Sequence, residues 1–138
     1  MRMAKSGSIK MAVILKAKPS EVFKALTNSR SILKWSGQRG KVEATIGGTF
    51  QMFDGWVKGK VLAYQNGKTL TYTWHPSDWS KETKSSIVTF KFTASGKNTK
   101  VLLTHNGFPD EATMKEHRAG WTEHIFDPLR EFLETEEA

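Results

Sequence analysis

The chain has 138 residues, 38% of them hydrophobic, no cysteine and a net charge of +7. This composition excludes a disordered chain, a disulfide scaffold and a thiolate metal site. We expect neither a membrane helix nor a secretory signal. Sixteen of the 21 basic residues are Lys, spread singly along the chain, so we expect a solvated basic surface and no nucleic-acid or membrane partner. We predict a cytoplasmic protein with a flexible N-terminus at residues 1–8 and one domain at residues 9–138.

The N-terminal part of the sequence predicts one strand followed by two short helices. Residues 9–16 alternate imperfectly and are rich in β-forming residues, which is typical of a strand. A helix can begin at Pro19 or Ser20, because proline is favoured in the first helical turn. Residues 27–29 interrupt this helix, and a second short helix then carries Trp35.

From residue 41 onward the apolar residues recur with period two, which indicates strands. Tight turns are predicted at Gly47-Gly48, Asp54-Gly55, Asn66-Gly67 and Ser95-Gly96. Because consecutive hairpins join antiparallel strands, the segment predicts an antiparallel meander. The expected strands are residues 41–45, 48–53, 56–64, 68–74, 85–94 and 98–105.

Residues 110–134 predict a long helix with Asp110 as its N-cap. Pro128 lacks a backbone N–H, so we expect a kink near residues 124–128. Only this helix is long enough to cover the apolar face of a seven-stranded sheet. The sequence therefore predicts an α+β fold in which a curved antiparallel sheet of about seven strands wraps around a long C-terminal helix, with two short helices after strand 1.

A ligand cavity is expected between the sheet and this helix, because the curvatures of a sheet and a helix do not match. Inward-facing residues would line it, with Trp35 near its mouth and His105 as a polar group that orients a ligand. Ordinary core packing is the alternative for each of them. The candidate lining residues are Trp35, Tyr72, Trp74, Phe90, Phe92, Leu103, His105, Trp121 and Ile125.

The sequence carries no motif that assigns catalysis, metal binding or a cofactor. It has no nucleophile elbow, no phosphate-binding loop and no H-E-x-x-H pair. His117 and His124 are seven residues apart, about 10 Å along a helix, which is too far to bind one metal ion together. We expect no catalytic residue, no metal and no cofactor, and an enzymatic role would depend on His105.

Three stretches, in the same order, resemble the C-terminal domain of the activator of the 90-kDa heat-shock protein ATPase. They are residues 47–59 (GGTFQMFDGWVKG), Trp74 with Trp79, and the tail from Gly107-Phe108-Pro109 to Gly120-Trp121. The resemblance covers residues 9–134 and implies the START and birch-pollen-allergen-like superfamily. The helix-grip fold of that superfamily agrees with the predicted order of elements.

The resemblance implies three alternative functions. Since superfamily members typically hold apolar molecules under the long helix, the leading expectation is non-enzymatic binding of an apolar or aromatic small molecule in that cavity. The second is a co-chaperone-like protein that docks on a heat-shock chaperone through its basic surface and the loop around Trp79. The third is a cyclase- or hydrolase-type enzyme that uses His105. The sequence does not predict the oligomeric state.

Overall fold

The computed structural model describes residues 7–136, and the elements follow in the predicted order. The strands are β1 (Ile9–Leu15), β2 (Lys41–Val42), β3 (Thr49–Met52), β4 (Val57–Gln65), β5 (Thr69–Pro76), β6 (Ser86–Ser95) and β7 (Asn98–Asn106). The helices are α1 (Pro19–Thr27), α2 (Ser29–Ser36), α3 (Glu111–Gly120), the π-helical η1 (Trp121–Phe126) and α4 (Asp127–Glu136). The predicted flexible segment 1–8 falls mainly outside the described residues.

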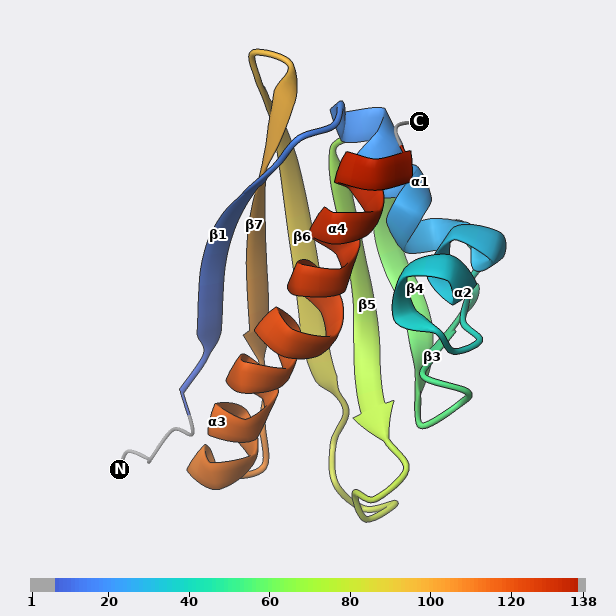
Figure 1. Cartoon of the computed structure of the whole chain (residues 1–138). Helices are drawn as coiled ribbons and strands as arrows, with labels where there is room; N and C mark the ends of the chain where they lie inside the picture. The colour runs from blue at the N-terminus through green and yellow to red at the C-terminus, as the bar shows by residue number, and fades with distance from the viewer. Residues whose placement is uncertain (1–6, 137–138) are drawn as a thin grey trace.

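All seven strands form one antiparallel sheet in the order β1-β7-β6-β5-β4-β3-β2. The C-terminal helical segment crosses one face of this sheet, and α1 and α2 lie beside it near β3 and β4 (Figure 1). The predicted hairpins are present, and β1 closes the order by pairing with β7, with Ile9 opposite His105. The predicted α+β, helix-grip fold is confirmed.

The largest difference between a predicted and an observed strand is at β2. We predicted residues 41–45, but the strand ends at Val42. The Thr45 N–H donates to the Glu43 carbonyl and the Gly48 N–H to the Thr45 carbonyl. These local bonds turn the chain back toward β3, so the β-forming residues after Val42 belong to a turn.

The strand β4 approaches β5 so closely that only glycine fits at one position. A Cβ atom at Gly59 would overlap the backbone carbonyl of Thr73. Two residues later the register of the pair shifts between Val61 and Ala63, and irregularities of this kind bend a strand. Gly59 therefore permits the close approach of β4 to β5.

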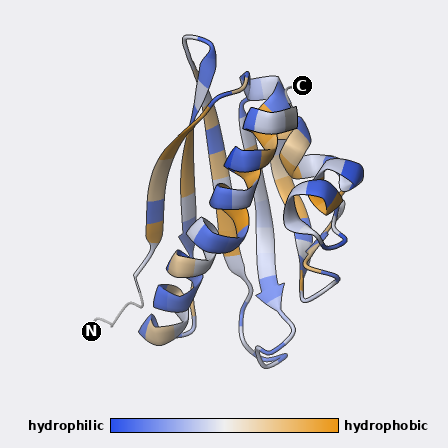
Figure 2. Ribbon diagram, in the orientation of Figure 1, coloured by the Kyte–Doolittle hydropathy of each residue, from blue (hydrophilic) through white to orange (hydrophobic). Residues whose placement is uncertain are grey.

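The core lies between the inner face of the sheet and the helices. Alternate residues of β5, β6 and β7 are buried there, and the residues between them face outward. The buried residues at these alternating positions include Leu70, Tyr72, Trp74, Ser86, Val88, Phe90, Phe92, Thr99, Val101, Leu103 and His105. Orange stretches are visible on β1 and β6, whereas many of the helix turns that face the viewer are blue (Figure 2).

The C-terminal helical segment is not one uninterrupted α-helix. The Asp127 N–H donates to the carbonyl of Thr122, five residues earlier, which is the bonding pattern of a π-helix. Pro128 follows directly and has no N–H to donate. The kink that we expected at residues 124–128 is therefore a π-helical turn that begins at Trp121. None of the helices within residues 7–136 is long and apolar enough to cross a membrane.

Candidate functional site

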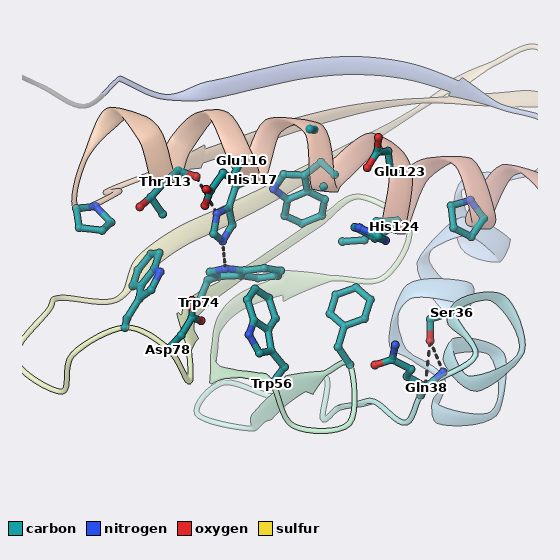
Figure 3. Close-up of a pocket in the computed structure, with 18 of the residues that line it drawn as sticks. Ser36, Gln38, Trp56, Trp74, Asp78, Thr113, Glu116, His117, Glu123 and His124 are labelled. Atoms are coloured by element: carbon teal, nitrogen blue, oxygen red, sulfur yellow. Dashed lines mark hydrogen bonds between the residues drawn. The ribbon is translucent and has the colours of Figure 1, made fainter.

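An open pocket of about 920 Å³ lies at one end of the sheet. The α3–η1 segment forms one side, and the opposite side comes from the turn at residues 53–56, the loop after β5 and the segment after α2 (Figure 3). Pockets of a few hundred to about 1,000 Å³ are typical of small-molecule sites. Aromatic and imidazole rings make up much of the wall: Phe53, Trp56, Trp74, Trp79, His117, Trp121 and His124.

The antiparallel topology brings these segments together. Each hairpin reverses the chain, so every second connection lies at the same end of the sheet. The β3–β4 turn, the β5–β6 loop and the connection from β7 to α3 are such connections, and they lie at the lower end of the molecule in Figure 1. This end therefore collects Trp56, Trp79 and the first turns of α3.

The turn at residues 53–56 is held in an unusual backbone conformation. Phe53 and Asp54 have φ values of 53° and 57°, in the left-handed region that a bulky residue such as Phe rarely adopts. The Arg39 N–H donates to the Asp54 carboxylate at 2.8 Å, and the Asp54 N–H donates to the Arg39 carbonyl at 2.9 Å. These two hydrogen bonds fix the turn, whose residues Phe53 and Trp56 line the pocket.

His117 connects α3 to the sheet across the pocket. The Trp74 Nε1–H donates to His117 Nε2 at 3.0 Å, and His117 Nδ1 lies 3.0 Å from the Thr113 carbonyl (Figure 3). Since Nε2 accepts and a carbonyl can only accept, the proton of the ring is on Nδ1. The rings of Trp56 and Trp79 also contact this imidazole. His117 is therefore the centre of the aromatic wall.

A second histidine holds a second tryptophan from inside the core. The Trp121 Nε1–H donates to His105 Nδ1 at 2.9 Å, and His105 Nε2 lies 2.8 Å from Ser86 Oγ. Ser86 Oγ donates its own proton to the Trp74 carbonyl, so the His105 proton is on Nε2. Both ring nitrogens are used within the protein, and His105 is fully buried.

Burial controls the protonation of both histidines. It lowers the pKa of His105 to about 2, with a smaller contribution from the neighbouring His117. Burial also lowers the pKa of His117, although the bond to Thr113 and the charges of Asp78 and Glu116 act in the opposite direction. Both rings are therefore neutral at neutral pH, as their hydrogen bonds require.

Three of the nine predicted lining residues line this pocket, namely Trp74, Trp121 and Ile125. The other six are buried behind it and do not line it: Trp35, Tyr72, Phe90, Phe92, Leu103 and His105. Their side chains fill the space between sheet and helix, and Tyr72 stacks on Phe50 with ring centroids 3.8 Å apart. Trp35 is buried and does not line the pocket. Its indole donates to the Ala25 carbonyl at 2.8 Å and joins α2 to α1.

Sequence reasoning missed five aromatic or imidazole residues as candidate ligand contacts: Phe53, Trp56, Trp79, His117 and His124. Inward alternation identifies residues that face the helix, whereas Phe53, Trp56 and Trp79 belong to turns and loops. The sequence does contain a signal that could have found them. In an antiparallel meander every second connection lies at the same end of the sheet, and this rule places residues 53–56, residues 77–85 and the start of α3 at one end.

The model of the family described as activator of Hsp90 ATPase homolog 1-like protein matches residues 16–134. The activator of 90 kDa heat shock protein ATPase homolog 2 of Mus musculus is 26% identical over 116 residues, which are 83% of this chain and 34% of that protein. This chain thus spans about a third of the length of the mouse relative.

Solved structures show the same fold. An HSP90 activator of Plasmodium falciparum superposes with a TM-score of 0.83 at 24% identity, covering 92% of this chain and 96% of that one. A protein of Mesorhizobium loti superposes with a TM-score of 0.80 at 25% identity, covering 93% and 97%. With the fold shared and the family model matched over residues 16–134, the chain belongs to the activator of Hsp90 ATPase homolog 1-like family.

Proposed function

We propose that this protein binds a small molecule with an aromatic or other flat apolar body in the pocket beside α3, without acting on it as an enzyme. The observation that carries this proposal is the pocket of about 920 Å³ whose lining includes the side chains of four tryptophans, one phenylalanine and two histidines. Aromatic walls bind flat apolar molecules through stacking and edge contacts. A few polar groups at such a wall fix the orientation of a ligand.

The fixed positions of the rings support this proposal. The Trp74 indole is held by His117 and the Trp121 indole by His105. A wall that is already ordered loses less conformational entropy when a ligand binds. The Trp56 side chain is 38% exposed, so part of its surface is available for contact with a ligand.

The proposal is tested with the variant Trp56→Ala and the neutral probe 1-naphthalenemethanol. We expect the probe to shift the indole N–H resonances of Trp74 and Trp121 in an NMR titration. Loss of one stacking surface should weaken the affinity about fivefold. The matched control is Tyr64→Ala, because Tyr64 is also on the β4 side, is 39% exposed and does not line the pocket. Equal affinities of Trp56→Ala and wild type, or no shift at millimolar probe, would contradict the proposal.

A second candidate function is that of a co-chaperone of a 90-kDa heat-shock chaperone in the cytoplasm. The mouse and Plasmodium relatives are both described as activators of this chaperone, and family membership makes the same partner a reasonable candidate here. The test is the rate of ATP hydrolysis by the chaperone of the same organism, with and without this protein. A rate that stays unchanged at a saturating excess of the protein would eliminate this candidate.

The cyclase- or hydrolase-type alternative gains no support from His105. A general acid or base must reach the substrate, directly or through one water. Both nitrogens of His105 are bonded to Trp121 and Ser86, and the ring does not line the pocket. Non-enzymatic binding therefore remains the better supported function.

A further inference from the structure

The charges around the pocket differ from those of the chain as a whole. The sequence contains 21 Lys and Arg residues against 14 Asp and Glu, but neither Lys nor Arg is among the residues that line this pocket. Four acidic residues line it: Asp78, Asp110, Glu116 and Glu123. A concave surface lined by charges of one sign concentrates ligands of the opposite sign.

These four carboxylates form no ion pair with a basic side chain in the described part of the chain. Within residues 7–136 the ion pairs are Lys41–Glu43, Lys115–Glu111 and Arg130–Asp127. None of them includes a carboxylate of the pocket. The Thr113 N–H donates to Asp110 at 2.8 Å and lowers the pKa of that carboxyl, so Asp110 keeps its charge at neutral pH.

His117 does not supply a compensating positive charge. Its Nε2 accepts from Trp74 and its Nδ1–H donates to Thr113, an arrangement that requires a neutral ring. Asp78 and Glu116 are near enough to this ring to act on its protonation. In Figure 3 Glu116 is drawn on α3 beside His117, and Asp78 is drawn on the loop after β5, next to Trp74. Their negative charge is therefore available to a ligand.

The aromatic side chains of the pocket also favour a positively charged ligand, because the faces of indole and phenyl rings attract cations. Trp56 and Trp79 both contact His117, and Trp79 directly follows Asp78 in the chain. On the basis of the proposed function, we propose that the ligand is an organic cation, in which a protonated or quaternary amine is attached to an aromatic or other flat apolar body. The flat body would lie against Phe53 and Trp56, and the ammonium group would face Asp78 and Glu116.

Three probes with the same ring system and different charges test this inference. They are 1-naphthylmethylammonium, neutral 1-naphthalenemethanol and the anion 1-naphthoate, each titrated by NMR into the full chain at low salt. We expect the ammonium to bind about 10-fold more tightly than the alcohol, and the naphthoate most weakly. Added sodium chloride should weaken the binding of the ammonium and leave that of the alcohol nearly unchanged.

Charge-neutral variants show whether the pocket carboxylates cause this preference. In Asp78→Asn/Glu116→Gln we expect the advantage of the ammonium over the alcohol to fall to about threefold or less, while the alcohol binds as to wild type. The matched control is Glu111→Gln, which removes an exposed carboxylate of α3 outside the pocket and should change neither affinity. If the double variant does not fold, Glu116→Gln alone gives the same comparison on an exposed position.

The outcomes separate this inference from the proposed function on which it rests. Equal binding of the ammonium and the alcohol would overturn the cation preference and leave aromatic binding intact. Tighter binding of the naphthoate would overturn it as well. Binding of none of the three probes would overturn both.

Discussion

The two halves of the C-terminal helical segment meet the sheet in different ways. The second half, α4, buries Leu129 and Leu133, whereas α3 has no buried residue. The pocket lies beside α3, where His117 reaches across to Trp74 by a hydrogen bond. The same helical path thus stabilises the fold by apolar burial at one end and leaves room for a ligand at the other. The difference comes from the side chains, because both halves cross the same face of the sheet.

The largest effect on stability should follow from truncating a buried side chain of α4. We expect Leu129→Ala to lower the free energy of unfolding by about 3 kcal/mol, because a fully buried leucine leaves a cavity when it is truncated. Met114→Ala, in the half-buried part of α3, should cost about 1 kcal/mol. Denaturant unfolding measures both values. Equal losses of unfolding free energy in the two variants would show that α4 does not contribute more than α3 to stability by apolar burial.

The affinity of Leu129→Ala for 1-naphthalenemethanol tests whether the pocket beside α3 is independent of the packing under α4. Leu129 does not line the pocket, so the folded variant should bind this probe as wild type does. A large loss of affinity would mean that the pocket depends on the packing under α4.

An effect of intermediate size is expected from pH, through the buried histidine. The pKa of His105 is about 2 in the folded protein and near 6.5 in an unfolded chain. Below about pH 6.5 His105 therefore binds a proton in the unfolded state but not in the folded state, and the free energy of unfolding falls as the pH drops. Between pH 7 and pH 5 this costs about 2 kcal/mol. The lowered pKa of His117 acts in the same direction.

Denaturant unfolding at the two pH values measures this loss. In His105→Gln, which lacks the titrating ring, the loss between pH 7 and pH 5 should be smaller. Where this variant is too unstable to study, the His105 ring of the wild type serves instead. Its NMR resonances should not titrate between pH 4 and pH 8, and a midpoint near pH 6 would refute the explanation.

The smallest effect on stability should come from His117, which joins α3 to the sheet by its hydrogen bond with Trp74. His117→Leu leaves the indole N–H of buried Trp74 without its acceptor, and we expect a loss of about 1 kcal/mol. His117→Gln retains a side-chain acceptor and should lose less. Unfolding curves give the energies, and the Trp74 indole N–H resonance reports the bond. Identical stabilities of both variants and wild type would show that the bond does not contribute.

Much of the fold was predictable because two periodicities determine it. The alternation in residues 85–105 predicts which side chains of β6 and β7 face inward, and the structure buries Phe90 and Leu103 accordingly. The interruption of the C-terminal helix was predictable from Pro128, but its form was not. A missing N–H can be accommodated by a kink or by a π-helical turn, and the sequence does not distinguish them; in the structure Trp121 and Phe126 are buried in a π-helical turn.

The lining of the pocket was less predictable, because an inward-facing position does not reveal whether space remains beside it. Phe90 and Trp121 both face the interior, and only Trp121 lines the pocket. That difference depends on how the rings stack in three dimensions. Trp56 and Trp79 were also uncertain from sequence, since turn residues carry no periodicity that indicates their direction.

The π-helical turn has a consequence for the register of the C-terminal segment. A π-helical turn contains an additional residue compared with an α-helical one, so in effect it is a one-residue insertion within the helix. Successive residues of an α-helix are about 100° apart around its axis. Deleting one residue between Trp121 and Phe126 would restore a regular helix and rotate α3 by that angle relative to α4. His117 would then point away from Trp74, and the pocket would lose the ring at its centre while the buried half kept its packing.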